Sequence, residues 1–198
     1  MPLIYQVMLA FCFEIKCYCL KIISYMYNNT ILGSAENEYV MKCIMRSFSC
    51  LDEHVMPYLA TCLPVLTQKL EVAAKNPTKP QFNHYLFEAL SLSIRIVVKV
   101  QPTAVTNFET VLFPVFQSIL QENVEEFLPY VFQILSLLLE VHSGTIPGPY
   151  MELFQFLLIP ALWESPANVR ALVRLLQVTF YENYLQRGSV ADPGIPGF

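Results

Sequence analysis

The most regular stretch of the chain runs from Phe82 to Lys99 and is apolar except along one line. Its polar residues recur in steps of four, three, four and four, at His84, Glu88, Ser91, Arg95 and Lys99. Such steps place side chains on one side of an α-helix. A helix that is apolar around most of its circumference has to be covered on several sides. The pattern therefore predicts a helix packed among other helices.

Helix start signals recur along the chain at a nearly constant interval. Asn37, Asn83, Asn123 and Asn168 each precede an apolar periodic segment, at intervals of 46, 40 and 45 residues. Asparagine is a strong N-cap because its side-chain oxygen accepts an amide hydrogen of the first turn. The intervals match the about 40–47 residues of HEAT or armadillo units, which stack helix pairs into a solenoid. We expect an all-α, HEAT-like helical-repeat solenoid.

A proline signature marks the second helix of each unit. An apolar pair, Pro, any residue and an apolar residue occur around Pro57, Pro114 and Pro160, and a copy at Pro129 lies near the start of a first helix. Proline lacks an amide donor and clashes with the preceding turn, so it marks a helix start or a kink. The expected helices cover residues 37–52, 55–74, 82–100, 105–121, 124–141, 150–163 and 167–186. They make up about three and a half helix pairs.

The repeats occupy residues 33–187 in this interpretation. Residues 1–32 are apolar and stay unassigned, because their pattern suits a buried helix or a strand equally well. Residues 188–198 contain three Gly and two Pro and are expected to form a frayed tail.

The apolar composition raises the question of a membrane protein. Apolar residues make up 55% of the 198 residues and charged residues only 14%. The longest run without Asp, Glu, Lys or Arg is His54–Gln68, with 15 residues. A transmembrane helix needs about 20 predominantly apolar residues. We therefore expect no membrane span, and a membrane-associated helical protein is the least favoured class.

The net charge of −4 is unevenly distributed. No Lys or Arg lies between Lys99 and Arg170, whereas the same stretch contains Glu109, Glu122, Glu125, Glu126, Glu140, Glu152 and Glu164. Nucleic acid is an improbable partner for such a surface, since its binding depends on neutralising phosphates. A basic protein partner is one interpretation. The other, which we favour, is that several of these glutamates lie in first turns of helices, where the helix dipole stabilises them.

No pattern of catalytic, cofactor-binding or metal-binding residues is present. The six cysteines include no Cys-x-x-Cys pair, and the three histidines lie far apart, so we expect reduced thiols and no zinc. The six glycines form no phosphate-binding loop. His54 and His142 fall at predicted helix ends, where histidine contacts free carbonyls, and His84 falls in a first turn. The chain is therefore not expected to be an enzyme.

The polar positions of the predicted second helices are the candidate partner-binding residues. In helix-pair solenoids the second helices line the concave side, against which partners lie. Steps of seven, four and three keep the polar residues of each helix on one face. The candidates are Thr61 and Gln68, then Thr110, Gln117 and Gln121, then Glu152 and Gln155. Exposure to solvent would also select polar residues at these positions, and that alternative stays open.

Several long stretches of the repeat region are similar to those of one known family. They are Gly33–Ser49, Lys75–Leu90, Ser93–Ile96, Asn107–Glu109, Glu126–Gln133, Ser136–Glu140 and Ala171–Gln177. In these stretches the chain resembles the CAS exportins of the importin-β superfamily. Residues 1–32 do not resemble the helices that we expect to precede this region in the family. Residues Val178–Tyr184 resemble an insertion relative to the family.

The resemblance implies an internal slice of a nuclear export receptor, located in both nucleus and cytoplasm. The parent receptor would carry importin-α out of the nucleus together with Ran-GTP, without cofactors. The N-terminal Ran-binding region of the family has no counterpart in this chain, so the slice is expected to lack that site. A helical-repeat scaffold unrelated to transport is the alternative function.

Overall fold

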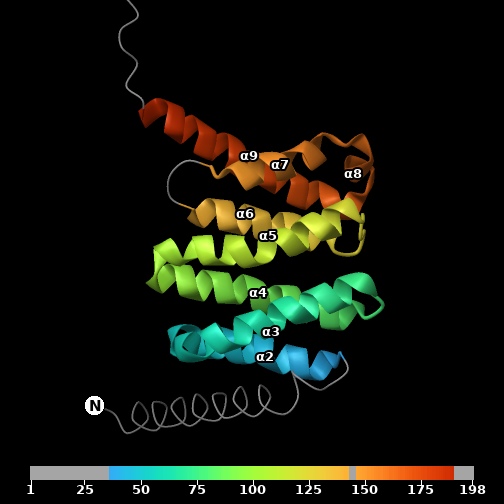
Figure 1. Cartoon of the computed structure of the whole chain (residues 1–198), viewed down its shortest axis with the longest axis vertical. Helices are drawn as coiled ribbons and strands as arrows, with labels where there is room; N and C mark the ends of the chain where they lie inside the picture. Colours follow the sequence, from blue (N-terminus) through green and yellow to red (C-terminus); the bar gives the residue numbers. More distant parts are fainter. Residues whose placement is uncertain (1–35, 143–145, 190–198) are drawn as a thin grey trace, which may run out of the picture. The chain divides into compact units, whose positions relative to one another are not determined.

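The computed structural model of the chain describes residues 36–142 and 146–189, with side chains as far as Tyr181. Throughout this part every regular element is a helix and none is a strand (Figure 1). The prediction of an all-α, HEAT-like helical-repeat fold is confirmed. The chain divides into two compact units, residues 1–100 and residues 101–198. The unassigned segment 1–32 and residues 190–198 of the predicted tail lie outside the described residues.

The first unit is built on α2 (Glu38–Leu51), α3 (Met56–Lys75) and α4 (Pro80–Val100), with a short 3₁₀ helix, η2 (Asp52–Val55), between α2 and α3. α4 packs along α2 and against α3, so the two first helices lie side by side (Figure 1). The core is formed by fully buried side chains that include Phe48, Leu66, Phe87 and Leu90. Burying one Leu or Phe side chain contributes about 1.5–3 kcal/mol. This unit is therefore held together by interleaved apolar faces.

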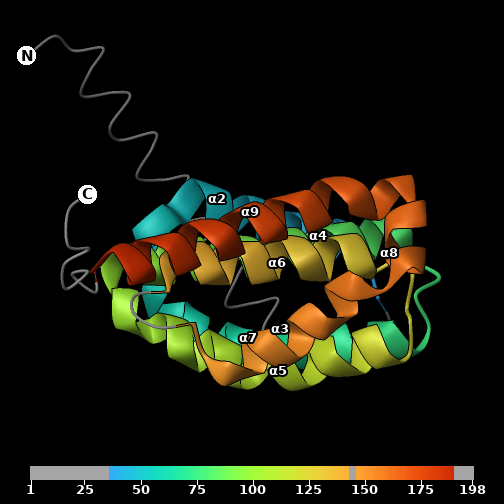
Figure 2. The ribbon, with the colours of Figure 1, turned by 90° about the horizontal axis from the view of Figure 1, so that it is seen from above.

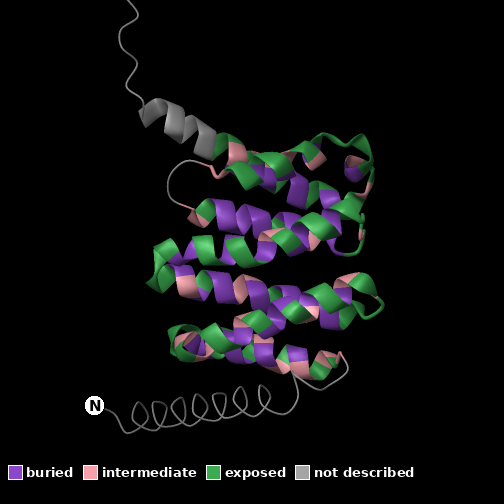
Figure 3. Ribbon diagram, in the orientation of Figure 1, coloured by how far each residue is buried: buried purple, intermediate pink, exposed green. Residues whose placement is uncertain are grey.

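The second unit consists of η3 (Pro102–Ala104), α5 (Val105–Gln121), α6 (Leu128–Val141), α7 (Gly148–Phe154), η4 (Gln155–Leu158), α8 (Pro160–Glu164) and α9 (Pro166–Ser189). α9 runs along α6, as Figure 2 shows, while α5 packs on α6 and α8 packs on α9. α6 is buried over most of its length (Figure 3). As in the first unit, two consecutive first helices stack on each other.

The polar line of α4 points outward as its spacing predicts. Glu88, Arg95 and Lys99 are exposed, whereas Leu86, Leu90 and Ile94 are fully buried. On α6, Gln133, Ser136 and Glu140 have the same spacing, and Gln133 and Glu140 are exposed. Ser136 is only 2% exposed, and its hydroxyl donates a 2.8 Å hydrogen bond to the carbonyl of Phe132. Bonding back to its own helix allows this hydroxyl to be buried.

Of the four asparagines that were expected to be N-caps, only Asn37 is one. Its Oδ1 accepts hydrogen bonds from the amides of Tyr39 and Val40, at 3.0 and 3.2 Å. The prediction is wrong for Asn83 and Asn168, which lie inside the first turns of α4 and α9 because proline starts both helices earlier.

Asn83 and Asn168 instead attach their helices to the chain just upstream. Each side chain is buried, and its Nδ2 donates to a carbonyl six residues upstream, at Pro77 in the linker before α4 (3.2 Å) and at Leu162 in α8 (3.1 Å). The Oδ1 of each has no hydrogen-bond partner among the described residues. These two asparagines therefore share a contact with the carbonyl six residues upstream rather than a cap.

α6 begins four residues later than its sequence pattern predicts. Asn123 has a φ of 50°, in the left-handed region that asparagine tolerates, and the chain turns there before Leu128. Pro129 lies in the first turn of α6. A helix that began at residue 124 would place the ring of this proline against the carbonyl of Glu125. The expected start is therefore wrong, and Pro129 determines the observed one.

The helix expected over residues 150–163 is broken into three pieces. α7 passes into the 3₁₀ turn η4, Ile159 is extended (φ −78°, ψ 112°), and α8 starts at Pro160. Proline disfavours the helical region for the residue before it, which favours the break at Ile159. The prolines inside α3 and α5 show that proline does not by itself end a helix. By contrast, α9 continues without interruption through residues 178–184 to Ser189, beyond the domain limit expected at residue 187.

Candidate partner-binding groove

A groove in the second unit collects four of the seven candidate partner-binding residues. Gln117 and Gln121 lie in the C-terminal part of α5, and Glu152 and Gln155 line the same hollow from α7 and η4; all four are exposed. Together with Phe113 and Phe156 they line a hollow of about 350 Å³. The spacing along α5 keeps its two glutamines on one face, so the helix period places them in this wall.

A second hollow, of about 530 Å³, adjoins the first. Gln121 and Phe156 line both hollows. The second is also lined by Asn123, Glu125, Leu128, Ile159, Glu164 and Asn168. It follows the turn after α5 on one side and the break at Ile159 on the other. We refer to the two hollows together as the α5–α7 groove.

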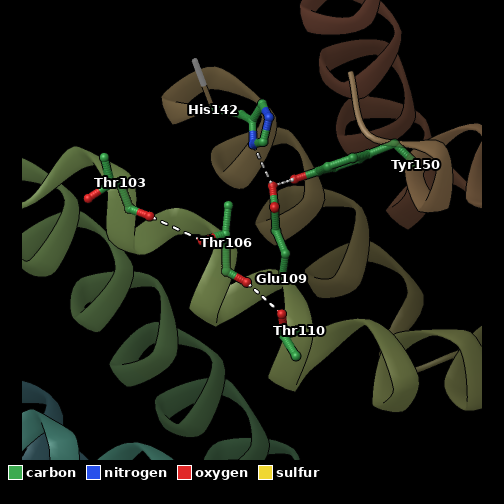
Figure 4. A network of polar contacts seen from close by, with 6 residues as sticks. All are labelled: Thr103, Thr106, Glu109, Thr110, His142 and Tyr150. Atoms are coloured by element: carbon green, nitrogen blue, oxygen red, sulfur yellow. Dashed lines mark hydrogen bonds and ion pairs between the residues drawn. The ribbon is translucent and has the colours of Figure 1, made fainter. Parts of the chain in front are cut away.

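The three other candidate residues lie elsewhere. Thr61 and Gln68 are exposed on α3, in the first unit. Thr110 is exposed on α5 but does not line the groove, and its hydroxyl donates a 2.8 Å bond to the carbonyl of Thr106 (Figure 4). A role in partner binding stays a prediction for all seven residues.

A buried polar cluster holds the helices behind the groove. Oε1 of Glu109, on α5, accepts hydrogen bonds from the hydroxyl of Tyr150 at 2.8 Å and from Nδ1 of His142 at 2.9 Å (Figure 4). Glu109 is 7% exposed and Tyr150 is fully buried. A carboxylate oxygen only accepts, so Nδ1 carries the hydrogen in this contact. The cluster therefore joins α5 to the C-cap of α6 and to α7.

The surroundings of Tyr150 keep its hydroxyl protonated. Burial raises the pKa of Tyr150 far above its usual value, and the charge of Glu109 and the hydrogen bond to it raise the pKa further. The ring also packs edge-on against Phe113, with centroids 4.8 Å apart. Since Phe113 lines the groove, the cluster and this ring contact together position α7 against α5.

Sequence reasoning missed this cluster. Glu109 was counted among the acidic residues of the surface, but it is buried. His142 was expected to contact free carbonyls at its helix end, and it contacts Glu109 instead. That expectation is confirmed for His54, whose Nδ1 lies 3.1 Å from the carbonyl of Leu51. His142 lies 33 residues and Tyr150 lies 41 residues from Glu109 in the sequence, so no local sequence pattern predicts that the three side chains meet.

The described residues contain free thiols at Cys43, Cys50 and Cys62. Burial raises the pKa of the Cys62 thiol to about 11. Within residues 36–142 and 146–189, no three His, Cys, Asp or Glu side chains are grouped so as to hold a metal ion. Nor is any helix in those ranges long and apolar enough to cross a bilayer.

The chain is a HEAT-like helical-repeat protein, because its first helices stack on each other and its second helices are marked by proline. The α5–α7 groove lies among the second helices of the second unit. A family model described as "CAS/CSE protein, C-terminus" matches residues 9–189. The expectation that residues 1–32 do not resemble the family is therefore wrong for residues 9–32. The chain belongs to this family, which confirms the resemblance to CAS exportins.

Individual relatives have high sequence identity to this chain. Exportin-2 of Homo sapiens is 59% identical over 173 residues, which are 85% of this chain and 17% of the relative. Exportin-2 of Oreochromis niloticus is 57% identical over 173 residues, covering 83% and 17%. Exportin-2 of Xenopus laevis is 55% identical over 170 residues, again covering 83% and 17%. The chain thus spans about a sixth of the length of the curated relatives that it matches.

Proposed function

We propose that the chain is one stretch of a nuclear export receptor that carries importin-α from the nucleus to the cytoplasm together with Ran-GTP. The observation that carries the proposal is the 59% identity to human Exportin-2 over 173 residues. The relative that has this identity over 85% of the chain is named Exportin-2, and that name denotes export. The groove is consistent with a receptor that acts by surface recognition.

The chain contributes only part of the binding surface. It spans 17% of the length of Exportin-2, and a solenoid binds its partners with surfaces distributed over many repeats. Each 1.4 kcal/mol of lost contact lowers affinity about tenfold. The isolated chain therefore binds importin-α and Ran-GTP weakly or not at all, while the same residues inside a full receptor support export.

A replacement experiment tests this function. Residues 33–189 substitute for the matching segment of a full-length Exportin-2, so that α9 is kept whole. The hybrid is expressed in cells depleted of their own receptor, and the nuclear fraction of importin-α is measured. Restored export supports the proposal. A hybrid that folds but leaves importin-α in the nucleus contradicts it.

Charge substitutions in the same hybrid test the contact residues. Gln68→Glu, Gln117→Glu and Gln121→Glu together are expected to reduce export. The matched control replaces three exposed glutamines outside the groove, Gln101, Gln133 and Gln177, with glutamate. If both triple variants export normally, the assigned contact residues are wrong although the receptor function stands.

A further inference from the structure

The charged residues that line the α5–α7 groove are all acidic. They are Glu125 and Glu164 in the larger hollow and Glu152 in the smaller one. All three are exposed, and none forms an ion pair with another described residue. No Lys or Arg occurs between Lys99 and Arg170 to neutralise them. Carboxylates around one hollow raise the local concentration of cations and attract cationic side chains.

The groove also offers apolar surface between these carboxylates. Phe113 and Phe156 are half-buried and line it, and Ile159 is 43% exposed. Burial of apolar surface supplies affinity without direction, whereas charged groups around it select the partner. A small cation could satisfy the carboxylates but would leave this apolar surface exposed to water. The groove therefore suits an occupant that has both cationic and apolar side chains.

Asn168 adds an unpaired polar group at the edge of the groove. It is 4% exposed, lines the larger hollow, and its Oδ1 has no hydrogen-bond partner among the described residues. A buried acceptor without a partner costs about 1–3 kcal/mol. Asn83, its counterpart in the first unit, has the same unpaired oxygen but does not line the hollow at the start of α4. The oxygen of Asn168 is shielded from solvent, so a donor in the groove reaches it only when this side chain turns outward.

We propose that the α5–α7 groove binds a basic peptide segment in which Lys or Arg alternates with apolar residues. Such a segment supplies cationic side chains for Glu125, Glu152 and Glu164 and apolar side chains for the two phenylalanines and Ile159. This rests on the proposed function, because it names the chemistry of the partner segment that the receptor surface receives. It is distinct from that function, because binding of a peptide is measured without export.

Peptide binding to the full 198-residue chain tests the proposal. The chain is immobilised at low density, which prevents association between copies, and three ten-residue peptides are applied. One alternates Lys with Leu, one alternates Glu with Leu, and one alternates Lys with Ser. We expect the Lys–Leu peptide to bind at least tenfold more tightly than the other two, and its binding to weaken as salt is added. Equal binding of all three, or no binding of the Lys–Leu peptide, would overturn the proposal.

Two charge-matched variants locate the binding site. Glu152→Gln with Glu164→Gln removes two carboxylates from the groove, and Glu71→Gln with Glu88→Gln removes two exposed carboxylates from the first unit. Circular dichroism confirms that both variants are folded. The groove variant should bind the Lys–Leu peptide about five- to tenfold more weakly, and the control should bind it as the unaltered chain does. An equal loss in both variants would show attraction to net charge alone and would refute a groove site.

The peptide result and the export result separate two errors. If the hybrid receptor exports importin-α but the groove variant binds the Lys–Leu peptide normally, the assignment of the groove is wrong and the receptor function stands. If the groove binds the peptide but the hybrid does not export, the proposed function is wrong.

Discussion

Lys99 in the first unit and Glu109 in the second make their polar contacts in opposite environments. In the first unit, Lys99 on α4 contacts Asp52 and Glu53 at 3.0 and 2.9 Å, and more than half of each side chain is exposed. In the second, Glu109 lies in the core and accepts hydrogen bonds from Tyr150 and His142. Exposed ion pairs contribute little to stability, whereas a buried acceptor is costly to remove. Polar contacts in the same repeat architecture therefore differ widely in their contribution to stability.

The second helices also differ between the units. α3 is continuous over 20 residues, with an exposed proline in its interior. In the second unit α5 is likewise continuous, but the second helix expected over residues 150–163 is divided into α7, η4 and α8, with the extended residue Ile159 between η4 and α8. Ile159 and Phe156, at this break, line the α5–α7 groove. The proposed binding groove thus lies where the repeat departs from regularity.

Removing the acceptor of the buried cluster should have the largest effect. Glu109→Ala leaves the Tyr150 hydroxyl and Nδ1 of His142 without their shared partner. Each buried donor without an acceptor costs about 1–3 kcal/mol, so we expect a loss of about 2–5 kcal/mol in the free energy of unfolding. Urea unfolding followed by circular dichroism measures it. Glu109→Gln retains an acceptor oxygen and should lose less; equal losses would mean that the hydrogen bonds do not account for the effect.

Alkaline pH should weaken the first unit through its buried thiol. The folded-state pKa of Cys62 is raised from 9.0 to about 11. Since the unfolded thiol loses its proton first, this contribution is complete below pH 9 and is lost as the pH rises towards 11. The expected loss is about 1–3 kcal/mol, and Cys62→Ala should remove it. Unfolding measured at pH 8, 9, 10 and 11 in both proteins provides the test, and parallel curves would contradict it.

Removing one donor from the cluster should cost less than removing the acceptor. Tyr150→Phe keeps the ring against Phe113 and deletes only the hydroxyl, while Glu109 retains His142. A hydrogen bond to a charged group contributes about 1.5–3 kcal/mol, and we expect a loss near the lower end. The same variant should bind the Lys–Leu peptide more weakly, because α7 is less firmly held. Unchanged stability would show that the hydroxyl contact is not stabilising.

The exposed ion pairs of the first unit should have the smallest effect. Lys99→Ala removes both contacts of that lysine, but solvent screens them, so we expect no measurable change in the urea midpoint at physiological salt. Lowering the ionic strength should reveal a small destabilisation. A loss as large as that of Glu109→Ala would remove the distinction between the two units.

The sequence by itself determined the class of fold and the faces of the helices. Apolar and polar positions along α4 have the period of a helix, and local periodicity is decided by backbone geometry within a few residues. The proline signatures are also local, and Pro57, Pro129 and Pro160 all lie at helix starts. Pro114 is the exception, since it lies inside α5.

The tertiary structure alone decided which polar residues meet. Asn83 and Asn168 resemble caps in sequence, and only the path of the chain before each helix shows that their side-chain amides bind carbonyls six residues upstream. Glu109, His142 and Tyr150 come from three separate elements, and Gln121 and Glu152 meet across two helices. Packing brings these residues together because the apolar faces determine how the helices stack. The distance between two residues along the sequence does not indicate whether they meet in the packed structure.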